Sequence, residues 1–393
     1  MNNYIEDFLD STETVDGSIN RFVVEGQEHI LFKKESLINM LRVSSSILNL
    51  KSTQVVPRSI VITPRDNHFV MIANNDMEYL EYRFEVLNPN DRLKEPIAIP
   101  FDILSPLLKL MSEDVLIYKG LDGYYIRLLL EGDLYLDLPK PEESLIEKPY
   151  KDVMSLDFKV ENAEKTNAVS SLHLYNGLKS LIPIVEEEIV LDRRRISFNR
   201  DKMFYNSSAY SIQYILPLPS FKISLRVAYA LKKILQVLPE GPVFFFRDNA
   251  MPSRIVVRYK NVEYSSYTTS MVDNKNLYDY LDRVQKYSGL QVEVKDLSKI
   301  LNIAVGLPYA KKEVKFKYQD ELILTVPMKT KESVFKLSSK KIGEDITKKE
   351  ITVQASRIKK LLDCFSAYEN ISISFLDSCI IINKGNLIGV LEL

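Results

Sequence analysis

The residue types that most often do chemistry are few and scattered in this chain of 393 residues. Its three histidines, His29, His68 and His173, lie in separate segments, so their spacing builds neither a zinc site nor a catalytic triad. The 12 glycines include no GxxxxGK[ST] phosphate loop. We therefore expect a protein that is not an enzyme, with no metal site and no cofactor.

The cysteines and tyrosines favour packing over chemistry. Cys364 falls on an apolar helical pattern and Cys379 in a strand pattern, and two cysteines are too few for a disulfide framework. We expect both to be buried free thiols. The 22 tyrosines could stack on nucleic-acid bases, but most lie in strand patterns such as YLEYRF, where aromatic residues are favoured anyway.

Composition limits the class of protein. Apolar residues make up 46% and charged residues 27%, as in globular proteins, and no apolar run approaches the roughly 18 residues of a membrane span. The beginning, MNNYIEDFLDSTETVDG, is acidic and has no signal-peptide pattern. We expect a cytoplasmic protein with no membrane partner. Because Lys+Arg (52) and Asp+Glu (53) nearly cancel, binding DNA would require positive charge gathered on one surface.

Three segments of the chain read alike, each a short strand, a helix of about three turns and a β-rich run. Their helices share an apolar stripe at i, i+3, i+4 and i+7, typical of one buried face. The stripes are Leu104, Leu107, Leu108 and Met111; Leu231, Ile234, Leu235 and Leu238; and Ile358, Leu361, Leu362 and Phe365. The first members are spaced by 127 residues twice (231 − 104 and 358 − 231).

A weaker set lies between them. One segment carries Leu37, Met40 and Leu41, another carries Leu297, Ile300 and Leu301, and the two are 260 residues apart (297 − 37). The middle copy, around 162–184, is the least clear. The repeats predict an α+β fold of three tandem domains, each with two β-α-β-β-β units and antiparallel sheets. We place the domains at 1–150, with an N-terminal extension over about 1–21, 151–282 and 283–393.

Three short stretches lie at turns and links of the repeats: Glu369-Asn370-Ile371, Leu376-Asp377-Ser378, and Val272-Asp273 with the run 277–280 (LYDY). Through them, and through the repeat from about Phe22 onward, the chain resembles the bacterial DNA polymerase III β subunit, the replicative sliding clamp. The first two stretches are similar to that family's "ENV" and "TDS" turns, and the third is similar to its "VDGRFPDY" link. The resemblance implies a head-to-tail dimeric ring, with helices lining the hole and sheets outside. It also implies that a DNA polymerase and a clamp loader dock through a short peptide motif.

The chain departs from the family where that peptide binds. The family's "TDGHRL" falls at 207–212 (SSAYSI) and its C-terminal "MPMRL" at 389–393 (GVLEL). We expect an apolar pocket there, with walls at Tyr210, Ile212, Tyr278, Val284, Val390 and Leu391. The departures and the N-terminal extension suggest a phage or mobile-element protein rather than a host housekeeping one.

A sliding ring needs attraction to phosphates without base-specific contacts. The expected lining helices carry many basic residues and fewer acids, chiefly Glu35, Asp102, Asp296 and Asp363. We expect the DNA-facing residues to be Arg42, Lys109, Lys179, Arg226, Lys232, Lys233, Lys299, Arg357, Lys359 and Lys360. For the ring interface we expect Leu134 and Leu136 of one chain to meet the region of Ile303 and Leu307 of the next.

The sequence thus predicts a DNA sliding clamp, a processivity factor that encircles double-stranded DNA without sequence specificity and tethers a polymerase. An alternative is a regulatory or interaction protein that keeps the clamp fold and binds a replication or transcription factor without acting as a loaded ring. A third, weaker hypothesis is a nucleic-acid enzyme with an unrecognised site.

Overall fold

The computed structural model describes nineteen stretches of the chain. These are residues 29–48, 59–65, 68–75, 77–84, 95–107, 114–120, 123–130, 132–138, 168–199, 201–218, 220–248, 253–268, 286–287, 289–307, 312–319, 321–329, 331–343, 346–347 and 349–393. They fall into two compact units. Unit 1 consists of Met1–Phe158, Gln236–Pro239 and Phe246–Tyr267, and unit 2 of Lys159–Leu235, Glu240–Phe245 and Thr268–Leu393.

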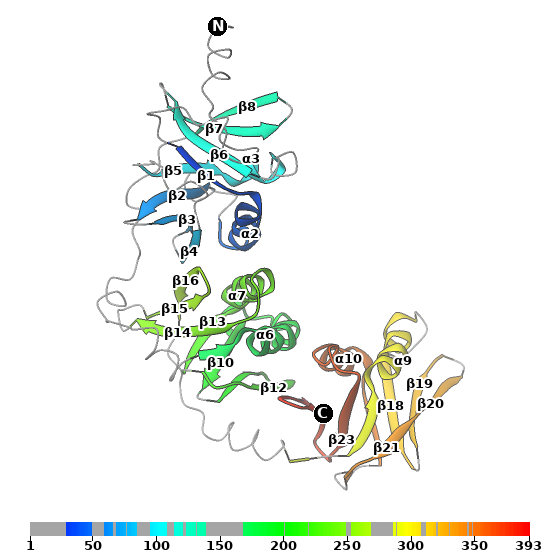
Figure 1. Ribbon diagram of the computed structural model, residues 1–393. Helices are drawn as coiled ribbons and strands as arrows, with labels where there is room; N and C mark the ends of the chain where they lie inside the picture. The colour runs from blue at the N-terminus through cyan, green and yellow to red at the C-terminus, as the bar shows by residue number, and fades with distance from the viewer. Residues whose placement is uncertain are drawn as a thin grey trace. The chain divides into compact units, whose positions relative to one another are not determined.

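The described elements repeat one order, a strand, a helix and three strands, and we number these repeats 1 to 6 along the chain (Figure 1). Repeat 1 is β1 (His29–Lys33), α2 (Lys34–Ser44), β2 (Ser59–Arg65), β3 (His68–Asn74) and β4 (Glu78–Phe84). Repeat 2 is β5 (Ile97–Pro100), α3 (Phe101–Leu107), β6 (Asp114–Gly120), β7 (Gly123–Leu130) and β8 (Gly132–Leu138).

Repeats 3 and 4 have the same order. Repeat 3 is β9 (Ala168–Ser170), α6 (Ser171–Val185), the short helix η4 (Leu191–Arg193), β10 (Arg195–Asn199), β11 (Lys202–Asn206) and β12 (Tyr210–Ile215). Repeat 4 is β13 (Phe221–Ser224), α7 (Leu225–Val237), β14 (Pro242–Asp248), β15 (Arg254–Tyr259) and β16 (Val262–Tyr267).

Repeats 5 and 6 complete the chain. Repeat 5 is β17 (Leu290–Glu293), α9 (Val294–Gly306), β18 (Glu313–Tyr318), β19 (Leu322–Pro327) and β20 (Glu332–Leu337), followed by the short strand β21 (Ser339–Lys341). Repeat 6 is β22 (Glu350–Gln354), α10 (Ala355–Asp363), β23 (Asn370–Phe375), β24 (Cys379–Lys384) and β25 (Leu387–Glu392). The predicted α+β fold with paired β-α-β-β-β units is confirmed.

Strand pairing repeats as faithfully as element order. The opening strand of each odd repeat pairs antiparallel with the strand after the helix of the next repeat: β1 with β6, β9 with β14 and β17 with β23. The opening strand of each even repeat pairs, also antiparallel, with the strand after the helix of the preceding repeat: β5 with β2, β13 with β10 and β22 with β18. The same exchange in three successive pairs of repeats is what a triplicated domain requires. The boundaries predicted for the domains stay a prediction.

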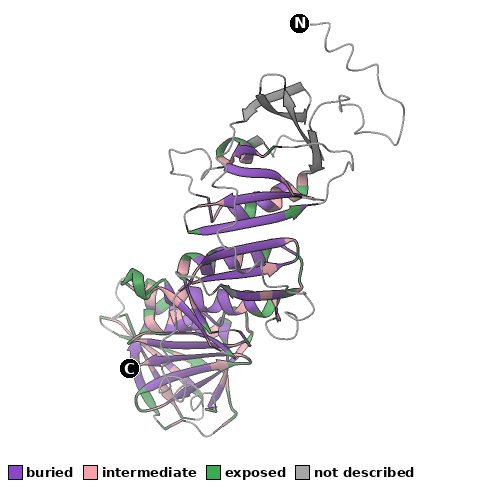
Figure 2. Cartoon of the chain, turned by 90° about the vertical axis from the view of Figure 1, so that its left-hand side faces the viewer, coloured by how far each residue is buried: buried purple, intermediate pink, exposed green. Residues whose placement is uncertain are grey.

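The apolar stripes expected from the sequence lie in the core. Leu37, Met40 and Leu41 of α2, and Leu297, Ile300 and Leu301 of α9, are buried. The stripes of α7 and α10 are buried along their length, and so is Leu104 of α3; the other members of the α3 stripe lie outside the residues whose side chains are described. Figure 2 shows the burial concentrated in the strands and the inner sides of the helices.

Repeat 3, the least clear by pattern, has a well-formed helix. On α6, Leu174, Leu178 and Leu181 are buried at helical spacing. Gly177 lies on the same face, where a Cβ would collide with Met203 Cε, so the helix packs closely against β11. Leu174 lies 137 residues after Leu37 and 123 before Leu297, so it divides the interval of 260 unevenly, and this copy does not follow the regular spacing of the others.

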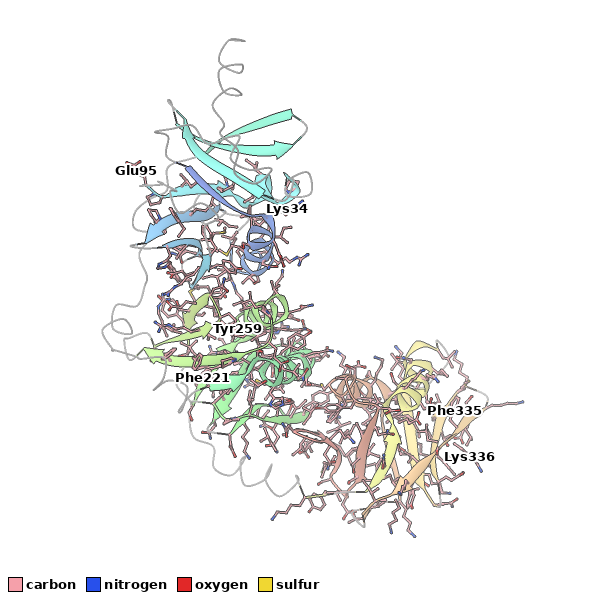
Figure 3. The ribbon with its side chains drawn as sticks, viewed as in Figure 1. Lys34, Glu95, Phe221, Tyr259, Phe335 and Lys336 are labelled. Carbon is pink, nitrogen blue, oxygen red and sulfur yellow. The ribbon has the colours of Figure 1, made fainter. Side chains whose placement is uncertain are left out.

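Aromatic side chains pack together in the core of unit 2. Phe221 stacks on Phe198 at 4.5 Å between ring centroids and lies 5.8 Å from Phe245. Phe316 and Phe375 meet at 5.4 Å. Figure 3 labels Phe221 within this packing. Such ring pairs add stability beyond their buried area, and they give the tyrosine- and phenylalanine-rich strands a structural role.

Candidate DNA-facing helices and partner pocket

Helix α7 separates apolar from basic residues. Val227, Leu231 and Ile234 are buried on one side, whereas Arg226 is exposed and Lys232 and Lys233 are partly exposed. Because apolar residues recur with the helical period, the basic residues between them turn away from the core. This helix therefore presents three cationic side chains on its outer side.

On helix α10 the basic residues are engaged with nearby groups. The Lys359 Nζ lies 2.9 Å from Asp363 Oδ2, one helical turn away, and Lys360 forms an ion pair with Glu187. The Arg357 guanidinium donates a hydrogen bond of 2.9 Å to the Glu392 carbonyl oxygen. Arg357 thus ties α10 to the end of β25, and the two lysines bring less net charge than their number suggests.

The remaining predicted cations are distributed over other helices. Arg42 at the end of α2 and Lys179 on α6 are exposed. Lys299 on α9 is exposed and lies 3.0 Å from Asp296 on the same helix. Lys109 lies outside the described residues. All nine described residues are therefore on helices or at their ends, and their contact with DNA stays a prediction.

Two groups of basic residues were missed by sequence reasoning. Lys295 is exposed on α9 beside the predicted Lys299. Arg193, Arg194 and Arg195 follow one another after α6, and the Arg194 Nε donates to the Glu188 carbonyl oxygen at 2.6 Å. The run of three arginines is visible in the sequence, but it lies outside the repeated helices on which the DNA-facing residues were predicted.

The segment that carries these arginines is held to β11 by a tyrosine–carboxylate pair. The Tyr205 hydroxyl donates to Glu188 Oε2 at 3.2 Å. Burial, and then the negative charge of Glu188, raise the pKa of Tyr205 to about 12. The pKa of Glu188 is lowered, first by the backbone N–H of Val190. Both directions favour a neutral tyrosine donating to an ionised glutamate, which fixes the loop between α6 and β10.

The residues predicted to wall a partner pocket lie on two faces of one sheet. Strands β12 and β25 pair antiparallel, with Tyr210 opposite Leu391 and Ile212 opposite Gly389. These residues share the face covered by α10: the Tyr210 hydroxyl donates to the Arg357 carbonyl oxygen at 3.4 Å, and a Cβ on Gly389 would come within 2.6 Å of Leu361 Cδ1. Tyr210, Ile212 and Leu391 are therefore core residues beneath a helix.

Val390 points to the opposite face, because neighbouring residues of a strand alternate in direction. There it belongs to a buried apolar cluster with Cys379, Ile381 and Ile388, against which Tyr287 and Leu376 pack. We name Cys379, Ile381, Ile388 and Val390 the outer cluster. Tyr278 and Val284 lie outside the described residues. Strand alternation from Val390 would have predicted Ile388, whereas Cys379 and Ile381 come from a strand that only the sheet order places next to it.

Both cysteines are buried free thiols, as predicted. Cys379 is part of the outer cluster, and Cys364 follows α10, where burial raises the pKa of its thiol. Burial therefore keeps the Cys364 thiol protonated, and the protonated thiol is less reactive than the thiolate.

The last strands of the repeats follow a regular pairing rule. The last strands of repeats 1 and 4, β4 and β16, pair with each other, and so do those of repeats 3 and 6, β12 and β25. In the described sheets β8 and β20, the last strands of repeats 2 and 5, are edges. The predicted interface residues Leu134 and Leu136 lie on β8. Ile303 is 38% exposed near the end of α9, and Leu307 follows that helix. Sequence reasoning did not identify β20.

Strand β20 presents an exposed outer surface. Val334 is 60% exposed, and the Lys336 Nζ lies 3.6 Å from Glu321 Oε2. Figure 3 labels Lys336 and its neighbour Phe335 on this strand. An edge strand carries unpaired backbone groups that can pair with another chain.

None of the described helices is long and apolar enough to cross a membrane. In the part of the chain that the structure describes, no three His, Cys, Asp or Glu side chains gather in a way that could hold a metal ion.

The fold is similar to solved structures of DNA polymerase III beta subunits. A sliding clamp (DNA polymerase III subunit beta) from Bartonella birtlesii, bound to griselimycin, matches with a TM-score of 0.71 at 14% identity, over 93% of this chain and 98% of that chain. One from Pseudomonas aeruginosa, also bound to griselimycin, matches with a TM-score of 0.69 at 13% identity, over 93% and 99%. The DNA polymerase III beta subunit of Thermotoga maritima matches with a TM-score of 0.66 at 15% identity, over 93% and 98%.

No protein-family model matches the chain, and no curated protein matches it significantly in sequence. At 12–15% identity, the structural matches establish architecture along nearly the whole chain. The chain therefore has the fold of the DNA polymerase III beta sliding clamps.

Proposed function

We propose that this protein is a DNA sliding clamp, a non-enzymatic processivity factor that acts on DNA in the cytoplasm. The single observation that carries the proposal is the pairing of last strands, in which β4 joins β16 and β12 joins β25 while β8 and β20 are sheet edges. Pairing β8 of one chain with β20 of the next would continue the same rule. A head-to-tail contact of this kind closes into a ring when the rotation between chains allows it.

The basic helices support DNA as the encircled partner. Arg226, Lys232 and Lys233 lie on the side of α7 that faces away from its core, and Arg42 and Lys179 are exposed on their own helices. Contacts of lysine and arginine with phosphates give affinity without sequence specificity. This is what sliding requires, because base-specific contacts would hold the ring at one place.

The outer cluster supports a docking region for a short peptide of a polymerase or clamp loader. Val390 is the residue of the predicted pocket that lies there, beside the partly buried Tyr287 and Leu376. The departures at 207–212 and 389–393 and the acidic N-terminal extension support a phage or mobile-element origin, with partners that differ from those of a host clamp.

Ring closure through β20 is tested by light scattering at micromolar concentration. The wild-type chain is expected to be a dimer, and Val334→Lys is expected to shift it toward monomer, because a lysine on an edge strand opposes strand addition. Val334 is 60% exposed, so the folded monomer should tolerate the change. Thr352→Lys, at an exposed position on β22, is the matched control and should stay dimeric.

A stable wild-type monomer would contradict the dimeric ring. It would favour the alternative function, a clamp-fold regulatory protein that binds a replication or transcription factor without being loaded on DNA.

The lining role of α7 is tested by charge reversal. Lys232→Glu with Lys233→Glu should weaken retention on DNA and reduce its dependence on salt, since each lost phosphate contact lowers the slope of log K against log salt by about 0.9. Lys340→Glu with Lys341→Glu, on the exposed strand β21, is the control for net charge. Equal effects of the two double variants would count against a channel lined by α7.

A further inference from the structure

Unit 1 contains a group of largely buried polar side chains that the proposed clamp function does not use. It lies on one face of the sheet formed by β4, β16 and β15. The pairing places Glu81 opposite Glu263 and Arg258 opposite Glu263, so these side chains share that face. Alternation along the same strands adds Tyr79, Arg83, Ser265, Tyr267 and Arg254 to it. We name this set the polar face.

Most charges of the polar face have partners. The Arg258 Nε lies 2.7 Å from Glu263 Oε2, and the Arg83 Nε lies 3.4 Å from Glu81 Oε1. The Tyr79 hydroxyl donates to Glu81 Oε2 at 2.9 Å. Burial, and then the positive charge of Arg83, lower the pKa of Arg258, which indicates a poorly hydrated surface.

Arg254 differs from the other two arginines. It is 7% exposed, its guanidinium lies 3.9 Å from the centroid of the Tyr267 ring, and its Nη1 is buried without a hydrogen-bond partner. The Ser265 hydroxyl is also buried without a hydrogen-bond partner. Because Arg254 pairs with Tyr267 and Val256 pairs with Ser265, Arg254 and Ser265 are diagonal neighbours on one face, within reach of a long side chain.

An arginine in this position needs a negative charge. A guanidinium stays protonated in proteins, and a buried ion without a counter-ion is strongly destabilising. The described part of the polar face has three arginines and two glutamates, an excess of one positive charge. The planar fork of donors suits the two oxygens of a carboxylate or phosphate, and a hydroxyl can donate to the same group.

We propose that Arg254 and Ser265 form a binding site for one oxyanion, a carboxylate or a phosphate, on the face of Tyr267. The Arg254 guanidinium supplies the charge and the fork of donors, Ser265 donates from its hydroxyl, and the Tyr267 ring holds the guanidinium in orientation by a cation–π contact. The site takes up the excess charge of the polar face.

The site is tested by calorimetric unfolding of the full chain without DNA, so its outcome is independent of the clamp function. Sodium acetate and sodium phosphate are compared with sodium chloride at equal ionic strength. At a concentration of about ten times its Kd for the site, either oxyanion should raise the wild-type Tm by about 3 °C over the value in chloride. A larger rise with acetate points to a carboxylate borne by a polypeptide, and a larger rise with phosphate points to a free ion.

Variants assign the effect to this site. Arg254→Gln should abolish the oxyanion-specific rise, Arg254→Lys should weaken it because the charge remains and the fork is lost, and Ser265→Ala should reduce it. Arg193→Gln, at an exposed arginine, is the matched control and should keep the full rise. No difference between oxyanions and chloride in the wild type, or an equal rise in Arg254→Gln or Arg254→Lys, would overturn the proposal.

Discussion

Two strand pairs, which we call joints, have the same place in the repeat, but one is lined by charged side chains and the other is not. Each joins the last strand of an odd repeat to the last strand of an even one, β4 to β16 in unit 1 and β12 to β25 in unit 2. The paired residues of the first joint include Glu78, Glu81 and Glu263, all at most 3% exposed. The paired residues of the second include no charged side chain.

The difference shows that backbone pairing sets the topology, while the side chains decide how strictly the partner strand is specified. In the first joint Glu81 lies directly opposite Glu263, an arrangement that is unfavourable unless cations offset it. Arg83 and Arg258 supply them. In the second joint Ile212, Leu391 and Tyr210 pack under α10, where shape and volume matter and no charge must be matched.

The largest effect should come from breaking the charged joint. Glu263→Gln leaves Arg258 without its carboxylate, and loss of one partner of a buried pair costs about 3–5 kcal/mol. Because Arg258 is 28% exposed, we expect a loss near the lower end of that range, measured by urea unfolding of the full chain. Glu293→Gln, at an exposed position on β17, is the control and should change stability little.

A loss for Glu263→Gln no larger than for its control would remove the distinction between the joints. The charged pair would then be incidental to the stability of unit 1.

The apolar joint should respond less to a conservative change. Ile212→Val removes one buried methylene group beneath α10 and should cost about 1 kcal/mol. Ile212 is fully buried, so the cost should appear in full in the same urea measurement. A loss of stability as large as that of Glu263→Gln would mean that the apolar side chains specify the partner strand as strictly as the charged ones.

The sequence was most informative where one helix face is buried. The stripes that begin at Leu231 and Ile358 predicted α7, α10 and the repeat, because apolar residues recur every three to four positions on the buried face of a helix. The pattern of repeat 3 is less clear in the sequence, because small residues such as Gly177 interrupt the apolar stripe of α6 where the helix packs closely on a strand.

The structure places the residues of the predicted pocket on two faces of one sheet, and the reason lies in sheet geometry. Val390 and Leu391 are neighbours in sequence and were placed in one pocket, but they point to opposite faces of β25. The polar face was not predicted either. Glu81 and Glu263 are 182 residues apart (263 − 81), and no local pattern indicates that β4 and β16 lie side by side.

We propose that this chain holds DNA by topology, as a ring that encircles the duplex. Retention of the loaded protein on a nicked circular plasmid, measured by gel filtration before and after the plasmid is cut once by a restriction enzyme, tests this proposal. We predict that the protein stays with the circle and is released by linearisation, because a ring slides off a free end. Equal retention on circular and linear DNA, or equal loss from both, would contradict the claim.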